Sequence, residues 1–522
     1  MTTGRNHPDS GNHKIGKMLA AAVLTLLLML AGCAGNDAIA ENASEQADNT
    51  VGAVASLTLY AADNEGIPYD IKARQDSENK VFYFFLPSTA NLSDIRVRAA
   101  QADGGAETDV LSLNFEECEY CVQCADGNEP YEIKAMQSKI PAVFIEINEA
   151  DGEISSMNGD PAHKTRCYGD MTVVVPEDLA AEKGWKTEYV SRENDPDSPG
   201  TMYMRGRGNW TWEQAKRPYQ IHLEKGENLL GMGKDKTWIL LANVLDASLL
   251  RNQLFYNLAA DMGMTYSPKI EPVDVFLNGD YLGSYSLTEK VQIDEDRVNI
   301  DEDKDFLIEL DHYYMKEIYT FATNSGLYFT LHNQENDDGV SRIQQIVNRI
   351  EEKFYNEESD AYLDNIDLDS WVRYWWLQDV SHNNDAFVGS NYFYYVSDED
   401  TLYAGPVWDM DNTLGISGDG ENLQTFGWHS ANRGWFKCLY DHESFRNALM
   451  DYYRSTLAEL IFALPQKIDE YAAYIRESAE MNYIINDRND YVNSGTKSWD
   501  EDVGYLKDFL NKRLDWYRQN LG

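Results

Sequence analysis

The spacing of apolar residues changes type along the chain, and this change limits the folds that the chain can adopt. Residues 53–112 alternate apolar and polar positions, and the apolar runs 81–87 and, in a second region from 139 onward, 171–175 also predict β-strands. Helical spacing first appears at 247–262, and it returns at 340–355, at 369–381 and in the tail from 441 onward. Strands that precede helices in this order predict an α+β fold.

A β-hairpin is predicted between these two regions. Asn278-Gly279 separates two apolar runs, and both residues tolerate the positive φ that a two-residue turn requires. The same patterns divide the chain. We expect a signal peptide over 1–32, a polar tether over 33–52, a small all-β, immunoglobulin-like sandwich over 53–135, and a main domain over 136–522 with a helical C-terminal part.

The first 33 residues predict export and a lipid anchor. A basic flank precedes the apolar run 18–30, which is too short to predict a membrane-spanning helix. Leu30-Ala31-Gly32-Cys33 resembles the lipobox of bacterial lipoproteins, which implies cleavage before Cys33 and a lipid on its thiol. The alternative is an ordinary signal peptide with an incidental cysteine. We therefore expect an extracytoplasmic protein that is lipid-anchored to a bacterial membrane.

The net charge argues against one class of partner. The chain has 88 Asp and Glu against 44 Lys and Arg, which gives a formal net charge of −44. A nucleic-acid binder needs a basic surface to neutralise phosphates, so we expect no nucleic-acid partner.

A short basic segment stands out against this acidic background. Arg205-Gly206-Arg207-Gly208 combines positive charge with glycines, which let backbone amides approach a phosphate closely. Lys216 opens the returning strand, where a kinase keeps its phosphate-pairing lysine. The alternative is a tight hairpin whose arginines pair with surface carboxylates.

Residues 381–415 carry the clearest chemical pattern. A helix leads into a polar loop that ends in Asp385, Asn391 follows six positions later, and a hairpin leads to Asp409 and Asp411. Protein kinases use this layout to orient the attacking hydroxyl and to hold Mg²⁺ on the phosphates. The pattern departs from ordinary kinases, because His-Arg-Asp and Asp-Phe-Gly are both missing and the hairpin is longer. Without a family match, the two late aspartates could equally cap a turn or bind a structural Ca²⁺.

Several ordered motifs together resemble the CotH (spore-coat protein H) family of atypical protein kinases. The resemblance covers roughly residues 140–420, and the helical tail also fits. It implies a divergent protein-kinase-like fold, ATP and Mg²⁺, and phosphorylation of Ser or Thr on proteins. The motifs are Arg205-Gly206-x-Gly208-Asn209-x-Thr211-Trp212, Lys216-x-Pro218-Tyr219, Trp238-x-Leu240-Leu241-Ala242-Asn243, Asp246-x-Ser248-Leu249-Leu250-Arg251-Asn252, Asn278-Gly279-x-Tyr281-x-Gly283-x-Tyr285 and Trp408-Asp409-x-Asp411.

The resemblance also implies roles for individual residues. Asp385 matches the catalytic aspartate and Asp409 the metal-binding aspartate, which Asp411 could support. Asn391 matches the asparagine of the family's Asn-Tyr-Tyr strand and would be a further metal ligand.

The resemblance does not fix which residues contact the nucleotide. We expect Lys216, and next Arg207, to contact the nucleotide phosphates. Glu289 lies at the end of a strand, where a nucleotide hinge would follow, although a surface carboxylate is an equal reading. Asp246 and Arg251 are expected to have structural roles, as a helix cap and as the partner of a buried carboxylate.

Together these expectations describe an extracytoplasmic CotH-like kinase that transfers the γ-phosphoryl group of ATP to Ser or Thr of a cell-surface protein. One alternative is a non-catalytic binding or structural module, and another is an enzyme that transfers a different part of ATP, such as AMP. The phosphotransfer reading requires the carboxylates near the hairpin to face the cationic glycine turn across a single cleft.

Three cysteines form a separate cluster with the spacing Cys118-x-x-Cys121-x-x-Cys124. They could bind a metal with Cys167 as a fourth ligand, or form disulfides, which an exported chain favours. Cys438 lies in an aromatic segment and is expected in the core.

Overall fold

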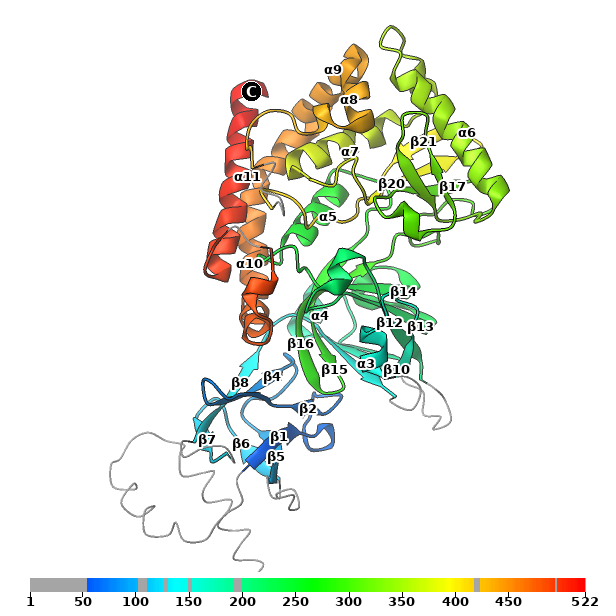
Figure 1. Ribbon diagram of the computed structural model, residues 1–522. Coiled ribbons are helices and arrows are strands. Elements are labelled where there is room, and N and C mark those ends of the chain that lie inside the picture. Colours follow the sequence, from blue (N-terminus) through cyan, green and yellow to red (C-terminus); the bar gives the residue numbers. More distant parts are fainter. Residues whose placement is uncertain are drawn as a thin grey trace, which may run out of the picture.

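The computed structural model describes residues 54–101, 110–124, 130–148, 153–191, 200–416, 423–492 and 495–521. The predicted signal peptide 1–32, the predicted lipidation site Cys33 and the predicted tether 33–52 lie outside the described residues. Among the described helices, none has the length and apolar character needed to cross a membrane. Figure 1 shows three stacked parts: a small β unit, a β-barrel, and a sheet surrounded by helices.

The β unit consists of two four-stranded sheets that share one hydrophobic core. Their strand orders are β2-β1-β5-β6 and β3-β4-β8-β7, and β4 pairs with β8 in parallel. The strands are β1 (Val54–Leu59), β2 (Ile71–Lys72), β3 (Arg74–Asp76), β4 (Val81–Leu86), β5 (Ile95–Gln101), β6 (Leu111–Leu113), β7 (Tyr120–Val122) and β8 (Tyr131–Gln137).

The middle part is a closed seven-stranded barrel. The strands follow the order β10-β12-β13-β14-β16-β15-β9, and β9 pairs again with β10, which closes the ring. A further strand, β11, pairs with the last part of β10. The strands are β9 (Ala142–Ile147), β10 (Cys167–Val174), β11 (Glu188–Ser191), β12 (Met202–Gly206), β13 (Tyr219–Asn228), β14 (Lys234–Leu241), β15 (Ile270–Leu277) and β16 (Asp280–Glu289).

This barrel contradicts the predicted fold class, a divergent kinase-like fold preceded by an immunoglobulin-like sandwich. The molecule mixes strands and helices, but its central sheet closes on itself. Closure depends on β9, which pairs antiparallel with β10 and parallel with β15. Residues 142–145 of β9 thereby meet residues 274–277 of β15. Apolar spacing within one segment carries no information about so distant a partner, so the sequence pattern did not predict the ring.

The predicted hairpin turn is present between β15 and β16. Asn278 and Gly279 adopt φ values of 47° and 82°, the left-handed pair that a tight two-residue turn requires. The Asn278 side chain also accepts a hydrogen bond from the Ile147 amide at 2.7 Å. The turn therefore helps to hold the end of β9 against the hairpin.

The third part contains a five-stranded sheet in the order β18-β19-β17-β20-β21. Its strands are β17 (Phe306–Leu310), β18 (Thr320–Ala322), β19 (Tyr328–Leu331), β20 (Asn391–Val396) and β21 (Thr401–Ala404). The longer helices are α5 (Arg251–Asp261), α6 (Asp337–Phe354), α7 (Leu368–Ser381), α8 (Gly434–Asp441), α9 (Glu443–Tyr452), α10 (Ala458–Ile485) and α11 (Trp499–Leu521). The short helices α3 (Ile154–Asn158) and α4 (Glu177–Lys183) belong to the barrel region.

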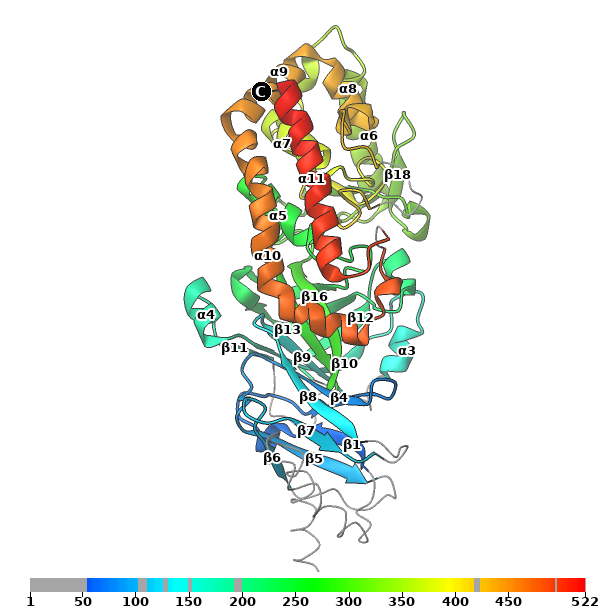
Figure 2. The ribbon, with the colours of Figure 1, turned by 90° about the vertical axis from the view of Figure 1, so that its left-hand side faces the viewer.

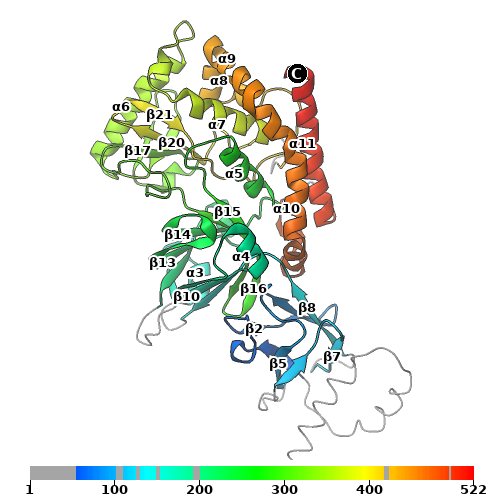
Figure 3. The same ribbon diagram turned by 180° about the vertical axis from the view of Figure 1, so that it is seen from behind.

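The long helix α10 connects the helical part to the barrel. Figures 2 and 3 show α10 and α11 side by side, with the end of α10 reaching β16. At this end Met481 joins the core of the β unit, together with Phe144 and Phe276 from the barrel. The three parts therefore share buried surface and form one packed body.

The cysteine cluster and Cys167 lie in different parts of the molecule. Cys124 is buried in the β unit, where its thiol donates to the Val54 carbonyl. Cys167 is buried inside the barrel, so it is not placed to complete a site with the other three. Among the described residues, no group of acidic, His or Cys side chains is arranged to hold a metal by itself. Cys438, which was expected in the core, is only half-buried and packs against the aromatic core from outside.

Candidate active site

A cavity of about 830 Å³ lies between the barrel and the five-stranded sheet. Barrel residues line one side, including the glycine turn after β12. The other side comes from the β17–β18 connection, from the loop before β20 and from the loop after β21. The cavity therefore brings Arg205 and Arg207 to the same space as Asp385 and Asp409.

The glycine turn presents its basic residues at the edge of the cavity. Gly208 has a φ of +85°, and a Cβ there would lie 2.4 Å from the Thr211 hydroxyl oxygen. Only glycine fits this position without strain, so the turn is tight. Arg205 precedes it and is fixed by bonds to the His163 carbonyl at 3.1 Å and to the Gln220 side chain at 2.9 Å.

Three basic side chains gather at this wall. The Arg207 guanidinium lies 5.5 Å from the centre of the Trp408 ring. Trp408 directly precedes Asp409 in the sequence. Lys290, the residue after β16, also lines the cavity. Burial, and then the charges of Arg205 and Arg207, lower the pKa of Lys290. Because these cations repel one another in a partly buried site, an anionic ligand would be stabilised here.

Asp385 lies in the loop between α7 and β20. Its carboxylate accepts a hydrogen bond from the Asn412 side chain at 3.1 Å. Asn384 also bonds the Asn412 side chain at 3.1 Å, and its amide donates to the Asn412 carbonyl. These contacts join the loop before β20 to the loop after β21, which carries Asp409.

Helix α5 holds the loop that carries Asp409 and Asp411. The Met410 amide donates to the Asn252 side chain at 2.9 Å, and the Asp409 amide donates to the Tyr256 hydroxyl at 3.2 Å. Arg251 donates to the carbonyl of Thr413 at 2.9 Å.

The expected structural roles of Asp246 and Arg251 match the contacts at the start of this helix. The Asp246 carboxylate accepts from the Arg251 backbone amide at 2.7 Å, and it also pairs with the Arg251 guanidinium. Both side chains are almost fully buried. The pair therefore anchors the first turn of α5, from which the Asp409 loop is held.

Burial disfavours the ionised forms of all three aspartates, and neighbouring negative charge adds to this at Asp385 and Asp411. Burial, and then the charge of Asp409, raise the pKa of Asp385 to about 6. Burial also raises the pKa of Asp409, against the effect of Arg207. Burial, Asp409 and Asp385 raise the pKa of Asp411 well above its usual value. A bound cation would relieve the charge repulsion that acts on Asp385 and Asp411.

The residues at this point fit a divalent cation that is completed by other oxygen ligands. One Asp411 carboxylate oxygen is buried and lacks a hydrogen-bond partner among the described residues. Oxygen-only donors suit Mg²⁺, which is commonly held by one or two carboxylates together with water and substrate phosphates. Two aspartates near the basic wall of the cavity meet this requirement, and within the described residues no cluster of three or more His, Cys, Asp or Glu side chains is arranged to hold a metal. Asp409 and Asp411 would hold the ion.

Lys216 does not line the cavity. Its ammonium group is fully buried, donates to the Ser284 carbonyl and bonds the Asn482 side chain at 3.0 Å. Burial lowers its pKa to about 7, and the nearby Asp274 opposes this shift. The structure therefore places Lys216 at the junction of the barrel with α10, outside the lining of the cavity.

Glu289 and Asn391 are also not part of the lining of the cavity. Glu289 is buried and pairs with Arg297 at 3.0 Å, and burial raises its pKa to about 7. The Asn391 amide donates to the carbonyls of Asp385 and Gly389. Asn391 thus shapes the Asp385 loop, and its side-chain oxygen accepts from Tyr374.

Two residues at the site were missed from the sequence. Lys290 follows Glu289 directly. Successive side chains of a strand point to opposite faces, so the choice of Glu289 could also have drawn attention to Lys290 on the other face. Asn412 follows Asp411 and bonds Asp385. Its signal was the group of polar residues at 409 and 411–413 after Trp408, although nothing in the sequence shows which of these side chains returns to Asp385.

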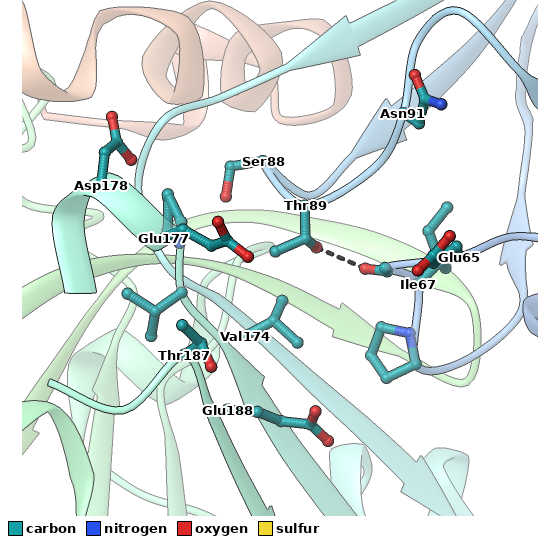
Figure 4. Close-up of a pocket in the computed structure, with 14 residues that line it drawn as sticks. Glu65, Ile67, Ser88, Thr89, Asn91, Val174, Glu177, Asp178, Thr187 and Glu188 are labelled. Atoms are coloured by element: carbon teal, nitrogen blue, oxygen red, sulfur yellow. Dashed lines mark hydrogen bonds between the residues drawn. The ribbon is translucent and has the colours of Figure 1, made fainter. Parts of the chain in front are cut away.

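A second cavity, of about 1120 Å³, lies between the β unit and the barrel (Figure 4). Its lining includes the carboxylates Glu65, Glu177, Asp178 and Glu188, and Thr89 there donates to the Gly66 carbonyl at 2.5 Å. Lys, Arg and His are missing from its described lining, so it lacks the positive charge that a triphosphate needs. The first cavity is therefore the better candidate for phosphate chemistry.

Comparison with known proteins agrees with the geometry of the first cavity. A protein-family model described as CotH kinase protein matches residues 204–517. The matched range includes the glycine turn, α5, Asp385 and the Asp409 loop. No curated protein was found to match the chain.

Proposed function

The chain belongs to the CotH kinase protein family, and on this premise we propose that it transfers the γ-phosphoryl group of ATP to a Ser or Thr hydroxyl of a protein. The observation that carries the proposal is the composition of one cavity. Arg205, Arg207 and Lys290 line one side, while Asp385 and Asp409 line the other. Phosphoryl transfer depends mainly on such positioning and charge neutralisation.

The phosphates of ATP would lie against the basic wall. The guanidinium of Arg207 offers several donors in a fixed plane, and the Lys290 ammonium adds a point charge. Mg²⁺ would be held by Asp409 and Asp411, where it would neutralise charge on the phosphate oxygens. Burial of these groups strengthens each electrostatic contact relative to water.

Asp385 would act on the acceptor. The acceptor oxygen forms a bond to the γ-phosphorus, the bond from that phosphorus to the bridging oxygen breaks, and ADP leaves. The proton of the hydroxyl passes to an Asp385 carboxylate oxygen. A base with a pKa of about 6 is ionised at neutral pH and remains basic enough to accept the proton.

The proposal is tested with γ-labelled ATP, Mg²⁺ and a protein extract as the source of acceptors. Wild-type protein should transfer label to protein, and Asp409→Ala should lose this transfer while keeping its melting temperature within a few degrees. Asp398→Asn is the matched control, because Asp398 lies on the turn between β20 and β21 with an 81% exposed side chain. This control should transfer label as well as wild type does.

Other outcomes would contradict the proposal in recognisable ways. Equal labelling by Asp409→Ala would remove Asp409 from the assigned role. A wild-type protein that fails to bind ATP with Mg²⁺ would support a non-catalytic binding or structural module. Transfer of label from the α-phosphate, with the corresponding product mass, would indicate transfer of AMP.

We also propose that the protein acts outside the cytoplasmic membrane, attached through a lipid on Cys33 and near acceptor proteins at the cell surface. The support is the lipobox-like Leu30-Ala31-Gly32-Cys33 at the end of an apolar run. Cells fed a labelled fatty acid should incorporate it into the wild-type chain and not into Cys33→Ala. Equal incorporation by both proteins would disprove the anchor.

A further inference from the structure

We propose that Arg433 is a positioning residue for the Asp385 loop, in addition to Asn391 and Asn412, an inference that rests on the proposed function. One nitrogen of its guanidinium, Nη1, donates to the Asn384 carbonyl at 2.8 Å and to the Ala386 carbonyl at 3.3 Å. These two carbonyls flank Asp385 in the sequence. A single side chain therefore binds the backbone on both sides of the proposed base.

The loop has a backbone that needs such support. His382, Phe387 and Ser390 have φ values of 50°, 56° and 55°, in the left-handed region that side-chain-bearing residues rarely adopt. Each such residue costs on the order of 1 kcal/mol or more and persists only where surrounding contacts hold it. The internal hydrogen bonds, from Val388 and Gly389 to the Asp385 carbonyl, span only a few residues.

Arg433 provides this support from a distant part of the chain. It directly precedes α8, and the next residue, Gly434, packs against Phe387 in the loop. A Cβ at position 434 would lie 2.4 Å from a ring atom of Phe387. Backbone packing and the guanidinium thus hold the same loop, and together they fix it against the helical part.

The charge of Arg433 is available to this loop. Among the described residues, no carboxylate lies within ion-pair distance of Arg433, unlike Arg251, Arg297 and Arg513, which are each paired with a buried acid. The half-buried guanidinium instead faces backbone carbonyls and lies near the Asp385 carboxylate. Hydrogen bonds from a charged donor are stronger than those from a neutral one.

Arg433 does not line the cavity, so it acts through the loop and not by touching ATP. Its loss should leave ATP binding intact and misplace the base relative to the acceptor hydroxyl. A displacement of about 1 Å in a reacting group can lower the rate on the order of 100-fold. A lower rate with unchanged ATP binding would distinguish this role of Arg433 from a general effect on folding. A general effect on folding would reduce ATP binding and kcat together.

The first test compares Arg433→Met and Arg433→Lys with a matched control, Arg446→Met. Arg446 is a half-buried arginine on α9 that donates to the Tyr440 carbonyl at 2.6 Å, away from the cavity. Arg433→Met should lower kcat about 100-fold with the KM for ATP unchanged. Arg433→Lys should recover part of the loss, because an ammonium also donates to carbonyls, and Arg446→Met should match wild type. A kcat for Arg433→Met within about twofold of wild type would overturn the inference.

The second test does not require activity. Amide hydrogen exchange of residues 383–389 should accelerate in Arg433→Met and remain at the wild-type rate in Arg446→Met. Unchanged exchange in Arg433→Met would overturn the inference even if the enzyme were active. If wild-type protein transfers no phosphate, the proposed function fails, and the exchange rates still decide whether Arg433 holds the loop.

Discussion

Asp385 lies where its ionised form is disfavoured, and this suits a general base. Burial and the charge of Asp409 raise its pKa to about 6, while the bond from Asn412 and the charge of Arg433 oppose the shift. The carboxylate is therefore ionised at neutral pH but holds a proton more readily than a solvent-exposed aspartate. The same setting affects both the reaction and the stability of the fold.

The rate of phosphoryl transfer should depend on pH through this group. Asp385 must be unprotonated to accept the hydroxyl proton, and Mg²⁺ bound at Asp409 would offset part of the repulsion that raises the pKa of Asp385, so kcat should fall as pH decreases below about 6. The measurement is kcat from pH 5 to pH 8 at saturating ATP and Mg²⁺, a range of about one to two units on each side of the pKa. A rate that stays constant across this range would show that another group limits the proton transfer.

Replacing Asp385 should stabilise the protein while it abolishes transfer. A folded-state pKa raised from 3.8 to about 6 means that the ionised carboxylate destabilises the fold above pH 6. Asp385→Asn removes that charge and should raise the free energy of unfolding at pH 8 by up to about 3 kcal/mol. The gain should shrink as pH falls through 6 toward 4. A variant less stable than wild type at pH 8 would contradict this reading.

Substitutions of Lys216 and of Lys290 should have different effects on ATP binding. Lys290→Met should weaken ATP binding about tenfold or more, because it removes a cation from the basic wall. Lys216→Met should leave ATP affinity unchanged, since its ammonium is buried against Ser284 and Asn482. Isothermal titration with ATP and Mg²⁺ measures both. Lost ATP affinity in Lys216→Met alone would reverse the assignment.

Single residues show how far the sequence predicts the site. Asp385, Asp409 and Arg207 were identified because loop, hairpin and glycine turn occur in a recognisable order, and the structure brings all three to one cavity. Lys216 and Asn391 carry equally suitable groups but face inward. The direction of a side chain near a strand end depends on what packs against it, and here α10 and the loop before β20 decide.

At the scale of elements, α5 connects the barrel to the loop that carries Asp409 and Asp411. Its first turn is fixed by Asp246, and its side chains then bond the backbone of the loop at Met410 and Thr413. The helix is therefore a support for Asp409 as well as part of the core. Damage to its loop-facing side should affect metal-dependent binding more than the fold.

Asn252→Ala should weaken Mg²⁺-dependent ATP binding. The substitution leaves the Met410 amide without its acceptor, which frees the loop that carries Asp409 and costs about 1–3 kcal/mol in fixing it. Titration of ATP with and without Mg²⁺ should show a loss of affinity confined to the Mg²⁺ condition. The matched control is Asn257→Ala on the same helix, whose side chain bonds the Tyr471 hydroxyl at 2.9 Å. Equal effects of both variants would refute the supporting role of α5.

Elements with strong local patterns were predicted closely, and their partners were not. The helical spacing at 340–355 and 369–381 corresponds to α6 (Asp337–Phe354) and α7 (Leu368–Ser381). The Asn278-Gly279 turn joins β15 and β16 as expected. The pairing of β9 with both β10 and β15 follows from neither pattern, because long-range strand pairing is decided by the whole packed assembly.

At the scale of the molecule, the β unit and the barrel are one cooperative body. Phe85 on β4 stacks on Tyr281 on β16 with ring centroids 4.7 Å apart, and both lie in a shared core. Two parts that share a core lose stabilising contacts when either unfolds. We therefore expect a single thermal transition for the wild-type protein.

Phe85→Ala should divide this transition. Truncation of a buried phenylalanine costs about 3–5 kcal/mol, and here the lost contacts include those that cross from the β unit to the barrel. Calorimetry should show an early transition for the β unit and a later one for the rest. The control is Phe115→Ala, which removes a half-buried ring that packs on Tyr120 within the β unit. A single thermal transition in Phe85→Ala would show that the contacts between the β unit and the barrel contribute little to their joint unfolding.

The closed ring of the barrel has a consequence for self-association in crowded surroundings. Seven strands that pair all the way around leave no ladder open for a neighbouring molecule, and among the described sheets the strands at an edge are short. These edge strands have two to four residues each: β2, β3, β6, β7, β11, β18 and β21. A protein so rich in β-structure is thereby protected against the strand-to-strand stacking that leads to fibrils.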